Sequence, residues 1–491
     1  MKRLLLLSLL ILFASPVYAA CTGSGAVWSC PAGTTAADVN AAISSASDGA
    51  TITFANGSYS GGWSLLTTNG VTLICATGAT CTHSGTVALG FYTTIITKFY
   101  RVSGFTFTGS GFVIEFCSAG SCSGGVTQAR VDHNTFTGGG SVLFGDNFGS
   151  AVHYGVVDHN TFTAAGNYLA VQAIAQEPDT APAGDNWAAN SLGTGNNLFI
   201  EDNTFTFTSM TNNGSGCIDS WGNQSIVARH NTATNCRILS HGVPHAGPQN
   251  FEVYNNTVTD NSDPAGLGYR LIHHQGSGTF MVFNNVLSPA NGSNMALLHY
   301  RAWTAVSVYV GAPLTLCDGT AAVDGNRSGE FGYPCYHQPG RDKDRVLHPI
   351  YLWNNQTSGG ANINLSVETG GSGSCPGDCT TQQVAANRDY YQGSSTAQTS
   401  QSASLTTGMQ FGPLAFRPTV CSTAGTDSAD AGHGGVGYFA TDVGAQGTLY
   451  QCSSTNTWTT YYTPYAYPHP LVTSGGAQPP APPTNLRAVV Q

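Results

Sequence analysis

One short motif recurs seven times along the chain. Its first copy reads Val131-Asp132-His133-Asn134-Thr135-Phe136, and each later copy has an asparagine at the equivalent place. These marker asparagines are Asn134, Asn160, Asn203, Asn231, Asn256, Asn285 and Asn355, separated by 26, 43, 28, 25, 29 and 70 residues. A unit of this length, with alternating apolar residues before a polar turn, cannot bury its apolar face alone and must stack on its neighbours. The repeat therefore predicts a β-solenoid with one coil per unit.

The marker position favours asparagine for two reasons. Asparagine tolerates the left-handed backbone conformation, so we expect it to occupy the turn itself. Its side chain can also hydrogen-bond to the equivalent asparagine on the next coil. The two long spacings predict insertions within residues 163 to 199 and 286 to 351, either as a projecting loop or as a further coil without the marker.

The segment before the repeats resembles a known fold. Residues Ala36 to Ala46 are typical of a short amphipathic helix, and Gly49-Ala50-Thr51-Ile52-Thr53-Phe54 leads to Gly57-Ser58-Tyr59. This order resembles the entry of pectate-lyase-like proteins, in which a small helix covers the first coil. Over about residues 35 to 370 the resemblance implies an all-β, right-handed parallel β-helix with an N-terminal capping helix. It implies fold and not activity.

The chain divides into four expected parts. We predict a signal peptide at 1–19, a β-helix with its cap and inserted loops at 20–415, a small β-hairpin module closing the far end at 416–475, and a disordered proline-rich tail at 476–491. The first part has Lys2 and Arg3 before an apolar run, and ends in the small-residue pattern Val17-Tyr18-Ala19. Export to the extracellular space is therefore expected, with the cell surface or the periplasm as alternatives. Cys21 leaves acylation open.

Fourteen cysteines fall into neighbouring couples. An even number of cysteines in an exported chain predicts disulfides, and metal binding is the alternative. The couples are Cys21/Cys30, Cys75/Cys81, Cys117/Cys122, Cys217/Cys236, Cys317/Cys335, Cys375/Cys379 and Cys421/Cys452.

Charge is scarce in this sequence. Only 9% of the residues are charged, against about 25% in an ordinary domain. The net charge of −10 argues against a nucleic acid or an anionic membrane as partner, and no apolar run downstream of the signal is long enough for membrane insertion. We expect a monomer that binds an extended, acidic polysaccharide through a local basic cluster.

Alignment of the coils by their markers predicts two ladders of polar residues. The first, two residues before the marker, contains Asp132, Asp158, Glu201 and Arg229. Three stacked carboxylates could hold Ca²⁺, which prefers several oxygen ligands. The alternative is a solvated, charged face.

The second ladder lies twelve to fifteen residues before the marker and gathers the candidate site. We predict catalytic roles for Asp219, His241, Arg270 and His273, and substrate binding by Trp221, His245, His274, His299, Tyr300 and Arg301. The loop from Cys317 to Cys335 and the charged residues after it, such as Arg341, could wall this cluster or form a salt-bridged surface.

Two carbohydrate-cleaving reactions fit these residue types. A uronate lyase needs a base, a cation for the uronate carboxylate and a donor for the leaving oxygen. Arg270 or Arg301 could bind the carboxylate, with His241, His273 or Tyr300 carrying protons. A glycoside hydrolase needs two carboxyl groups.

The order Cys217-Ile218-Asp219-Ser220-Trp221 and then Ser240-His241-Gly242 is similar to that of polygalacturonases. That family has two adjacent aspartates where this chain has only Asp219, and a lysine that is missing after Arg270-Leu271-Ile272. The lysine and arginine pair of the alginate lyase and chondroitinase B family is also missing from the cluster. If the chain is an enzyme, a uronate lyase is the first expectation. The alternatives are a hydrolase, a carbohydrate-binding protein or adhesin without catalysis, and a structural surface protein.

Overall fold

Three parallel sheets run the length of the computed structural model, which carries all side chains. The structure describes residues 19–65, 69–89, 96–116, 125–145, 153–165, 169–175, 191–209, 216–241, 247–261, 270–276, 278–288, 295–298, 319–320, 324–327, 330, 332–335, 338–342, 345–368, 384–423 and 430–473. The predicted signal peptide before residue 19 and the predicted tail after residue 473 lie outside these ranges.

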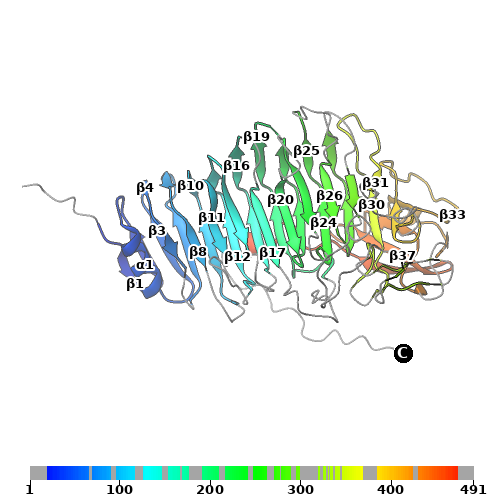
Figure 1. Cartoon of the computed structure of the whole chain (residues 1–491), viewed down its shortest axis with the longest axis horizontal. Helices are drawn as coiled ribbons and strands as arrows, with labels where there is room; N and C mark the ends of the chain where they lie inside the picture. The colour runs from blue at the N-terminus through cyan, green and yellow to red at the C-terminus, as the bar shows by residue number, and fades with distance from the viewer. Residues whose placement is uncertain are drawn as a thin grey trace, which may run out of the picture.

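Nine successive coils, over residues 50–298, each contribute one strand to each sheet, and they stack along the long axis in Figure 1. Sheet A consists of β1 (Thr22–Ser24), β2 (Val27–Cys30), β3 (Ala50–Phe54), β6 (Val71–Cys75), β9 (Tyr100–Ser103), β12 (Ala129–Asp132), β15 (Gly155–Asp158), β18 (Leu198–Glu201), β21 (Ile226–Arg229), β24 (Asn250–Tyr254), β27 (Thr279–Phe283), β30 (Ile350–Trp353) and β32 (Tyr390–Gln392). Sheet B consists of β4 (Gly57–Tyr59), β7 (Cys81–His83), β10 (Phe105–Phe107), β13 (Thr135–Phe136), β16 (Thr161–Ala164), β19 (Thr204–Phe207), β22 (Thr232–Thr234), β25 (Thr257–Thr259) and β28 (Val286–Ser288). Sheet C consists of β5 (Trp63–Ser64), β8 (Val87–Leu89), β11 (Gly111–Phe116), β14 (Gly140–Phe144), β17 (Val171–Ala175), β20 (Gly216–Gly222), β23 (Arg237–His241), β26 (Ile272–Gln275), β29 (Met295–Leu298) and β31 (Leu365–Glu368).

This arrangement confirms the predicted parallel β-helix. Both long marker spacings belong to single coils, because β15 pairs directly with β18 and β27 pairs directly with β30. No further coil therefore lies between these strands.

The marker asparagines form a buried ladder between sheets A and B. The backbone N–H of each of the first six donates to the side-chain oxygen of the next, at 2.9 to 3.3 Å. The expected left-handed residue is not the marker itself but the residue before it, with φ between 51° and 58°. These positions are His133, His159, Asp202, His230, Asn255, Asn284 and Asn354. Asparagine, aspartate and histidine are the side chains that enter this conformation most readily.

Stacked aromatic rings fill the interior beneath sheet B. Phe107, Phe136, Phe162 and Phe205 stack with centroids 5.2, 4.4 and 5.0 Å apart and interplanar angles of 12°, 4° and 12°. These near-parallel rings form a continuous aromatic stack through four consecutive coils.

The N-terminal end is capped as the sequence predicts. Helix α1 (Ala36–Ser45) begins after Thr35, whose hydroxyl accepts a hydrogen bond from the Asp38 N–H at 3.2 Å. It buries Val39, Ala42 and Ile43 against the first coil. The antiparallel pair β1 and β2 covers the edge of sheet A beside it.

Four of the predicted disulfides are present in the described residues. They join Cys21 to Cys30, Cys75 to Cys81, Cys217 to Cys236, and Cys421 to Cys452. Cys335 is also disulfide-bonded, and the remaining predicted couples lie outside the described ranges.

The C-terminal module is larger than the predicted hairpin and packs beside the coils as well as at their end (Figure 1). Its four-stranded sheet joins the predicted hairpin, β37 (Thr448–Ser454) and β38 (Thr457–Tyr462), to β36 (Gly437–Ala440) and β34 (Met409–Gly412). Its smaller elements are β33 (Ser404–Leu405), β35 (Val420–Cys421), the 3-10 helix η1 (Leu414–Phe416) and α4 (Pro470–Thr473). The module shares a second hydrophobic cluster with the outer face of sheet A, where Phe283 and Trp353 lie 5.5 and 4.7 Å from Phe439. In the described part of the chain, no helix has the length and apolar character needed to cross a membrane.

Candidate functional site

The first predicted ladder exists and lies on the outer face of sheet A. Asp132, Asp158, Glu201 and Arg229 occupy equivalent places on consecutive strands. All four are fully buried, so they are not the solvated face that was the alternative.

Each carboxylate of this ladder binds an arginine. Arg101 donates from Nε and Nη2 to the two Asp132 oxygens, at 2.7 and 2.6 Å. Arg130 forms the same fork with Asp158 at 2.9 and 2.8 Å. Arg229 donates from Nε to Glu201 at 2.7 Å. Two-pronged pairing of this kind uses both carboxylate oxygens.

The ladder also fastens the end of the chain. Arg229 donates to the carbonyls of Tyr465 and Ala466, at 2.7 and 2.8 Å, while Arg130 donates to those of Leu471 and Val472. The segment from Tyr462 to Thr473, which we call the strap, therefore lies along the outer face of sheet A.

These contacts occupy the oxygens that calcium would need. Among the described residues, no three His, Cys, Asp or Glu side chains are grouped as a metal site would require. Calcium binding at Asp132, Asp158 and Glu201 stays a prediction, and this geometry does not support it.

The second predicted cluster lies on sheet C. Strand pairing places Asp219 and His273 in one outward row, two strands apart, with Leu239 between them. Trp221 pairs with His241 in the next outward row. Arg270 precedes β26 by two residues. The side chain of His241, and all of His245, His299, Tyr300 and Arg301, lie outside the described residues.

His274 is a correction to the predicted site. It faces the interior, fully buried, and stacks on Phe251 and Phe280 with centroids 5.5 and 4.9 Å away. Its Nδ1 lies 2.8 Å from the Ser240 hydroxyl. Because side chains alternate along a strand, a residue next to outward-facing His273 must point inward and cannot contact a ligand on the outer face.

Glu368 joins the predicted residues Arg270 and His273 into one cluster. The Arg270 Nε donates to Glu368 Oε1 at 2.6 Å, and the His273 Nε2 lies 3.3 Å from Oε2. We treat the second contact as electrostatic, because its geometry falls short of a hydrogen bond. On the other side of the ring, Gln275 Nε2 lies 3.1 Å from His273 Nδ1. We call Arg270, His273, Gln275 and Glu368 the sheet C cluster.

The charge states of this cluster follow from burial and from its ion pairs. Burial lowers the pKa of His273 below its ordinary value, although Glu368 opposes the shift. The His273 ring is therefore neutral at neutral pH, and the Gln275 amide favours the tautomer with the proton on Nε2. Burial would raise the pKa of Glu368, but its contacts with His273 and Arg270 outweigh this and lower it to about 2.

Glu368 was missed by the coil alignment. It lies after the last marker, Asn355, so no later motif exists from which to count back. Gln275 was missed because a neutral amide carries no special pattern. The sequence did offer one indication for Glu368. Carboxylates are rare in this chain, so each one near the cluster was a candidate partner for its histidines and arginines.

Asp219 lies apart from the cluster. It is buried and accepts a hydrogen bond from Gln172 at 3.3 Å. Strands β20 and β31 are four places apart in sheet C, so Asp219 and Glu368 are separated by about 19 Å at the usual strand spacing. That distance exceeds the separation at which two carboxyl groups hydrolyse a glycosidic bond.

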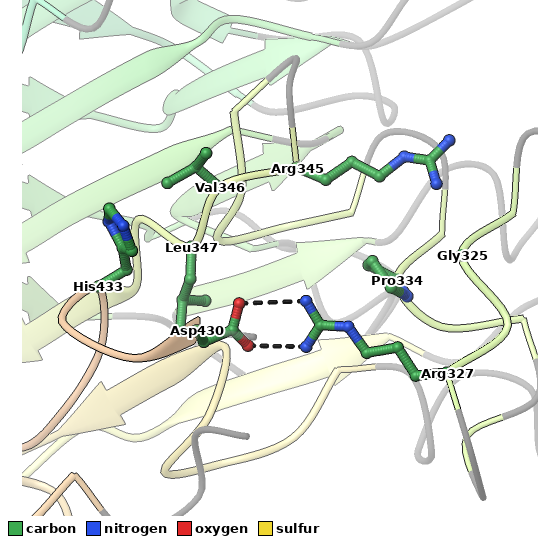
Figure 2. Close-up of a pocket in the computed structure, with 8 residues that line it drawn as sticks. All are labelled: Gly325, Arg327, Pro334, Arg345, Val346, Leu347, Asp430 and His433. Atoms are coloured by element: carbon green, nitrogen blue, oxygen red, sulfur yellow. Dashed lines mark hydrogen bonds and ion pairs between the residues drawn. The ribbon is translucent and has the colours of Figure 1, made fainter. Parts of the chain in front are cut away.

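A cavity of about 350 Å³ lies elsewhere, where the inserted loop meets the C-terminal module. Figure 2 shows Asp430 and Arg327 facing each other across it, at 2.8 and 3.2 Å. Arg341 binds the same carboxylate at 2.8 and 2.7 Å and is fully buried. In the described part of this loop, Arg327 and Arg341 therefore form a salt-bridged joint with Asp430.

The fold is therefore a parallel β-helix, and one of its outer faces carries a cluster of ionisable side chains. No protein-family model, no curated protein and no solved structure matches the chain.

Proposed function

We propose that this chain is an exported polysaccharide-active protein and that the sheet C cluster acts on a uronate-containing chain as a lyase. The observation that carries the proposal is Glu368, which holds a neutral histidine and a permanent cation together on one outer face. A lyase needs a base and a cation side by side.

The cluster supplies these parts as follows. His273 Nδ1 is the basic nitrogen, and it becomes accessible when a substrate displaces the Gln275 amide. It takes the proton from the carbon beside the uronate carboxylate. The bond to the leaving sugar oxygen then breaks, a carbon–carbon double bond forms, and the imidazolium returns the proton to that oxygen.

Glu368 and Arg270 act on either side of this transfer. The Glu368 carboxylate stabilises the imidazolium once it forms, as a carboxylate does for the histidine of a catalytic triad. Arg270 donates from Nε to Glu368, and in this proposal its guanidinium is the cation that binds the uronate carboxylate. Neutralising that carboxylate makes the neighbouring carbon acid stronger.

Export rests on the sequence and agrees with the disulfides. The leader pattern and several disulfide-bonded pairs are typical of chains that fold in an oxidising compartment. The resemblance to pectate-lyase-like proteins supports a polysaccharide as substrate at the level of fold alone.

One observation favours binding without catalysis. The side chain of His273 is only 8% exposed, whereas Arg270 and Glu368 are each 24% exposed. A ligand can therefore reach the ion pair more easily than the base. A carbohydrate-binding protein or adhesin is the second candidate.

The test is product formation on pectate, alginate and glycosaminoglycans, with and without calcium. Ultraviolet absorbance of the unsaturated uronate and the number of reducing ends are both measured, with His273→Ala, Arg270→Ala and Glu368→Gln as variants. Lys98→Ala, an exposed residue on another face, is the control. Absorbance that rises for the native chain and the control, but not for His273→Ala, supports the lyase. Binding without either product supports the second candidate.

A further inference from the structure

The outer face of sheet B carries two rows of hydroxyl side chains. Strand pairing places the first row at Ser58, Thr82, Thr106, Thr135, Thr161, Thr204, Thr232, Thr257 and Val286. The second row, two residues further along each strand, contains Ser60, Ser84, Thr108, Thr137, Thr163, Thr206, Thr234, Thr259 and Ser288. We call these eighteen positions the threonine array. All of them are exposed or half-exposed.

The array is not explained by strand propensity alone. Threonine does favour strands, but the solvent face of a sheet ordinarily mixes in charged residues. The outer face of sheet A carries Arg130, Asp158 and Glu252, and that of sheet C carries Asp219 and Glu368. The array has no charged side chain, although it covers nine consecutive strands.

The array is regular in two directions. Neighbouring coils are about 4.8 Å apart, and residues two apart on a strand are about 6.6 Å apart. A stack of near-parallel phenylalanine rings lies beneath the middle of the array. The two rows therefore repeat both from coil to coil and along each strand.

The side chains of this array are also stiff. Threonine is branched at Cβ and has few χ1 choices. The hydroxyls of Thr137 and Thr163 each donate to a carbonyl of the preceding coil, Phe107 and Phe136, at 3.2 Å. The hydroxyl and methyl groups are thus already held in place before a ligand binds. Their side chains therefore lose little conformational entropy on binding.

We propose that the threonine array binds the surface of ice. The coil-to-coil repeat of the array, about 4.8 Å, is close to the shorter oxygen repeat of the hexagonal ice lattice, so water held between the hydroxyls and methyl groups can follow the crystal along this direction. An ice surface is uncharged, flat and periodic, and it complements a face from which charge is missing in a chain of net charge −10. Many weak contacts made together give firm attachment. A dissolved acidic polysaccharide does not fit this face, which has neither a cation nor an aromatic platform.

The test uses the purified chain with its disulfides intact. Ice crystals are grown in droplets, and their shape and the gap between melting and freezing temperature are measured. Thr204→Tyr and Thr232→Tyr place bulky rings in the middle of the array, and we expect each to lose most of the gap. Thr460→Tyr, at an exposed position of β38 outside the array, is the matched control and should keep it.

Folding is checked by circular dichroism and thermal unfolding. If a tyrosine variant does not fold, Thr161→Lys tests the same face at an exposed position. The proposal is overturned if ice grows in the presence of this chain as it does with an inert protein at equal concentration. It is also overturned if the array variants leave the gap between melting and freezing temperature unchanged. Loss of binding to a neutral crystalline polysaccharide in these variants, with ice growth unaffected, also overturns it.

Discussion

At the scale of single residues, the stack is held by two positions that share each turn. The marker asparagine is buried and hydrogen-bonds from coil to coil, while the residue before it takes the left-handed conformation. The sequence predicted the ladder from the recurrence of asparagine. It did not separate the two roles, because asparagine is suited to both.

Replacing a marker asparagine in the middle of the ladder should destabilise the fold strongly. Asn203 binds the side-chain oxygen of Asn231 and the carbonyl of Val157. Asn203→Ala leaves these buried groups without partners, and we expect a loss of about 2 to 4 kcal/mol in the free energy of unfolding. Urea unfolding measures it, with exposed Asn362→Ala as the control. A loss as small as that of the control would contradict the role given to the ladder.

Glu252 predicts a dependence of stability on pH. It is fully buried, accepts hydrogen bonds from the Tyr462 hydroxyl and the Gly193 N–H, and burial raises its pKa to about 7. A raised pKa means that the folded chain holds the proton more tightly than the unfolded one. The stability that Glu252 contributes to the folded chain is therefore fully present when the pH is below the ordinary pKa of glutamate. It falls as the pH rises toward 7, by up to about 3 kcal/mol of the free energy of unfolding.

Glu252→Gln should remove this dependence. The variant is expected to melt at nearly the same temperature as the native chain at pH 5 and at a higher temperature at pH 8. Thermal unfolding of both chains across this pH range measures the effect. Because the buried histidines are the same in both chains, the difference in melting temperature at each pH reports Glu252 alone. A constant difference across the range would refute the assignment.

At the scale of elements, the strap packs over the charged ladder of sheet A and binds its arginines. The sequence predicted which residues stack, since Asp132, Asp158 and Glu201 pair in register as the marker alignment requires. It could not predict what covers them, because the strap is more than two hundred residues away from Arg229 in sequence. A repeat of about 27 residues gives no information about contacts with a segment that lies so far away in the sequence.

Arg229 is the residue on which this joint most depends. It contacts Glu201, Tyr254 and two carbonyls of the strap. Arg229→Ala leaves a buried carboxylate unpaired, and we expect a loss of about 3 to 5 kcal/mol in the free energy of unfolding. The strap should also become sensitive to limited proteolysis.

Lys98→Ala is the comparison for this variant. Lys98 pairs with Asp48, and both side chains are nearly half exposed, so its loss should cost about 0 to 1 kcal/mol. Equal effects for the two variants would mean that the strap is not anchored through Arg229.

At the scale of the whole molecule, the three outer faces carry different side chains. Sheet A contacts the strap, sheet C carries the ionisable sheet C cluster, and sheet B presents the threonine array. Fold class was predictable because every coil repeats the same pattern. The candidate cluster was predictable only in part. The coil alignment selected Arg270 and His273, which both contact Glu368, but Glu368 itself lies beyond the last marker. His274 was predicted on the outer face and instead faces the interior.

The most direct test of the sheet C cluster is the pH dependence of unsaturated product formation by the native chain on its best uronate substrate. A neutral His273 acting as base predicts that kcat/KM rises with pH, with a midpoint below the ordinary imidazole value of 6.5, and is level at neutral pH. Glu368→Gln should move this midpoint lower still, because the carboxylate no longer favours the imidazolium. No product at any pH, or a profile that His273→Ala leaves unchanged, would contradict the account.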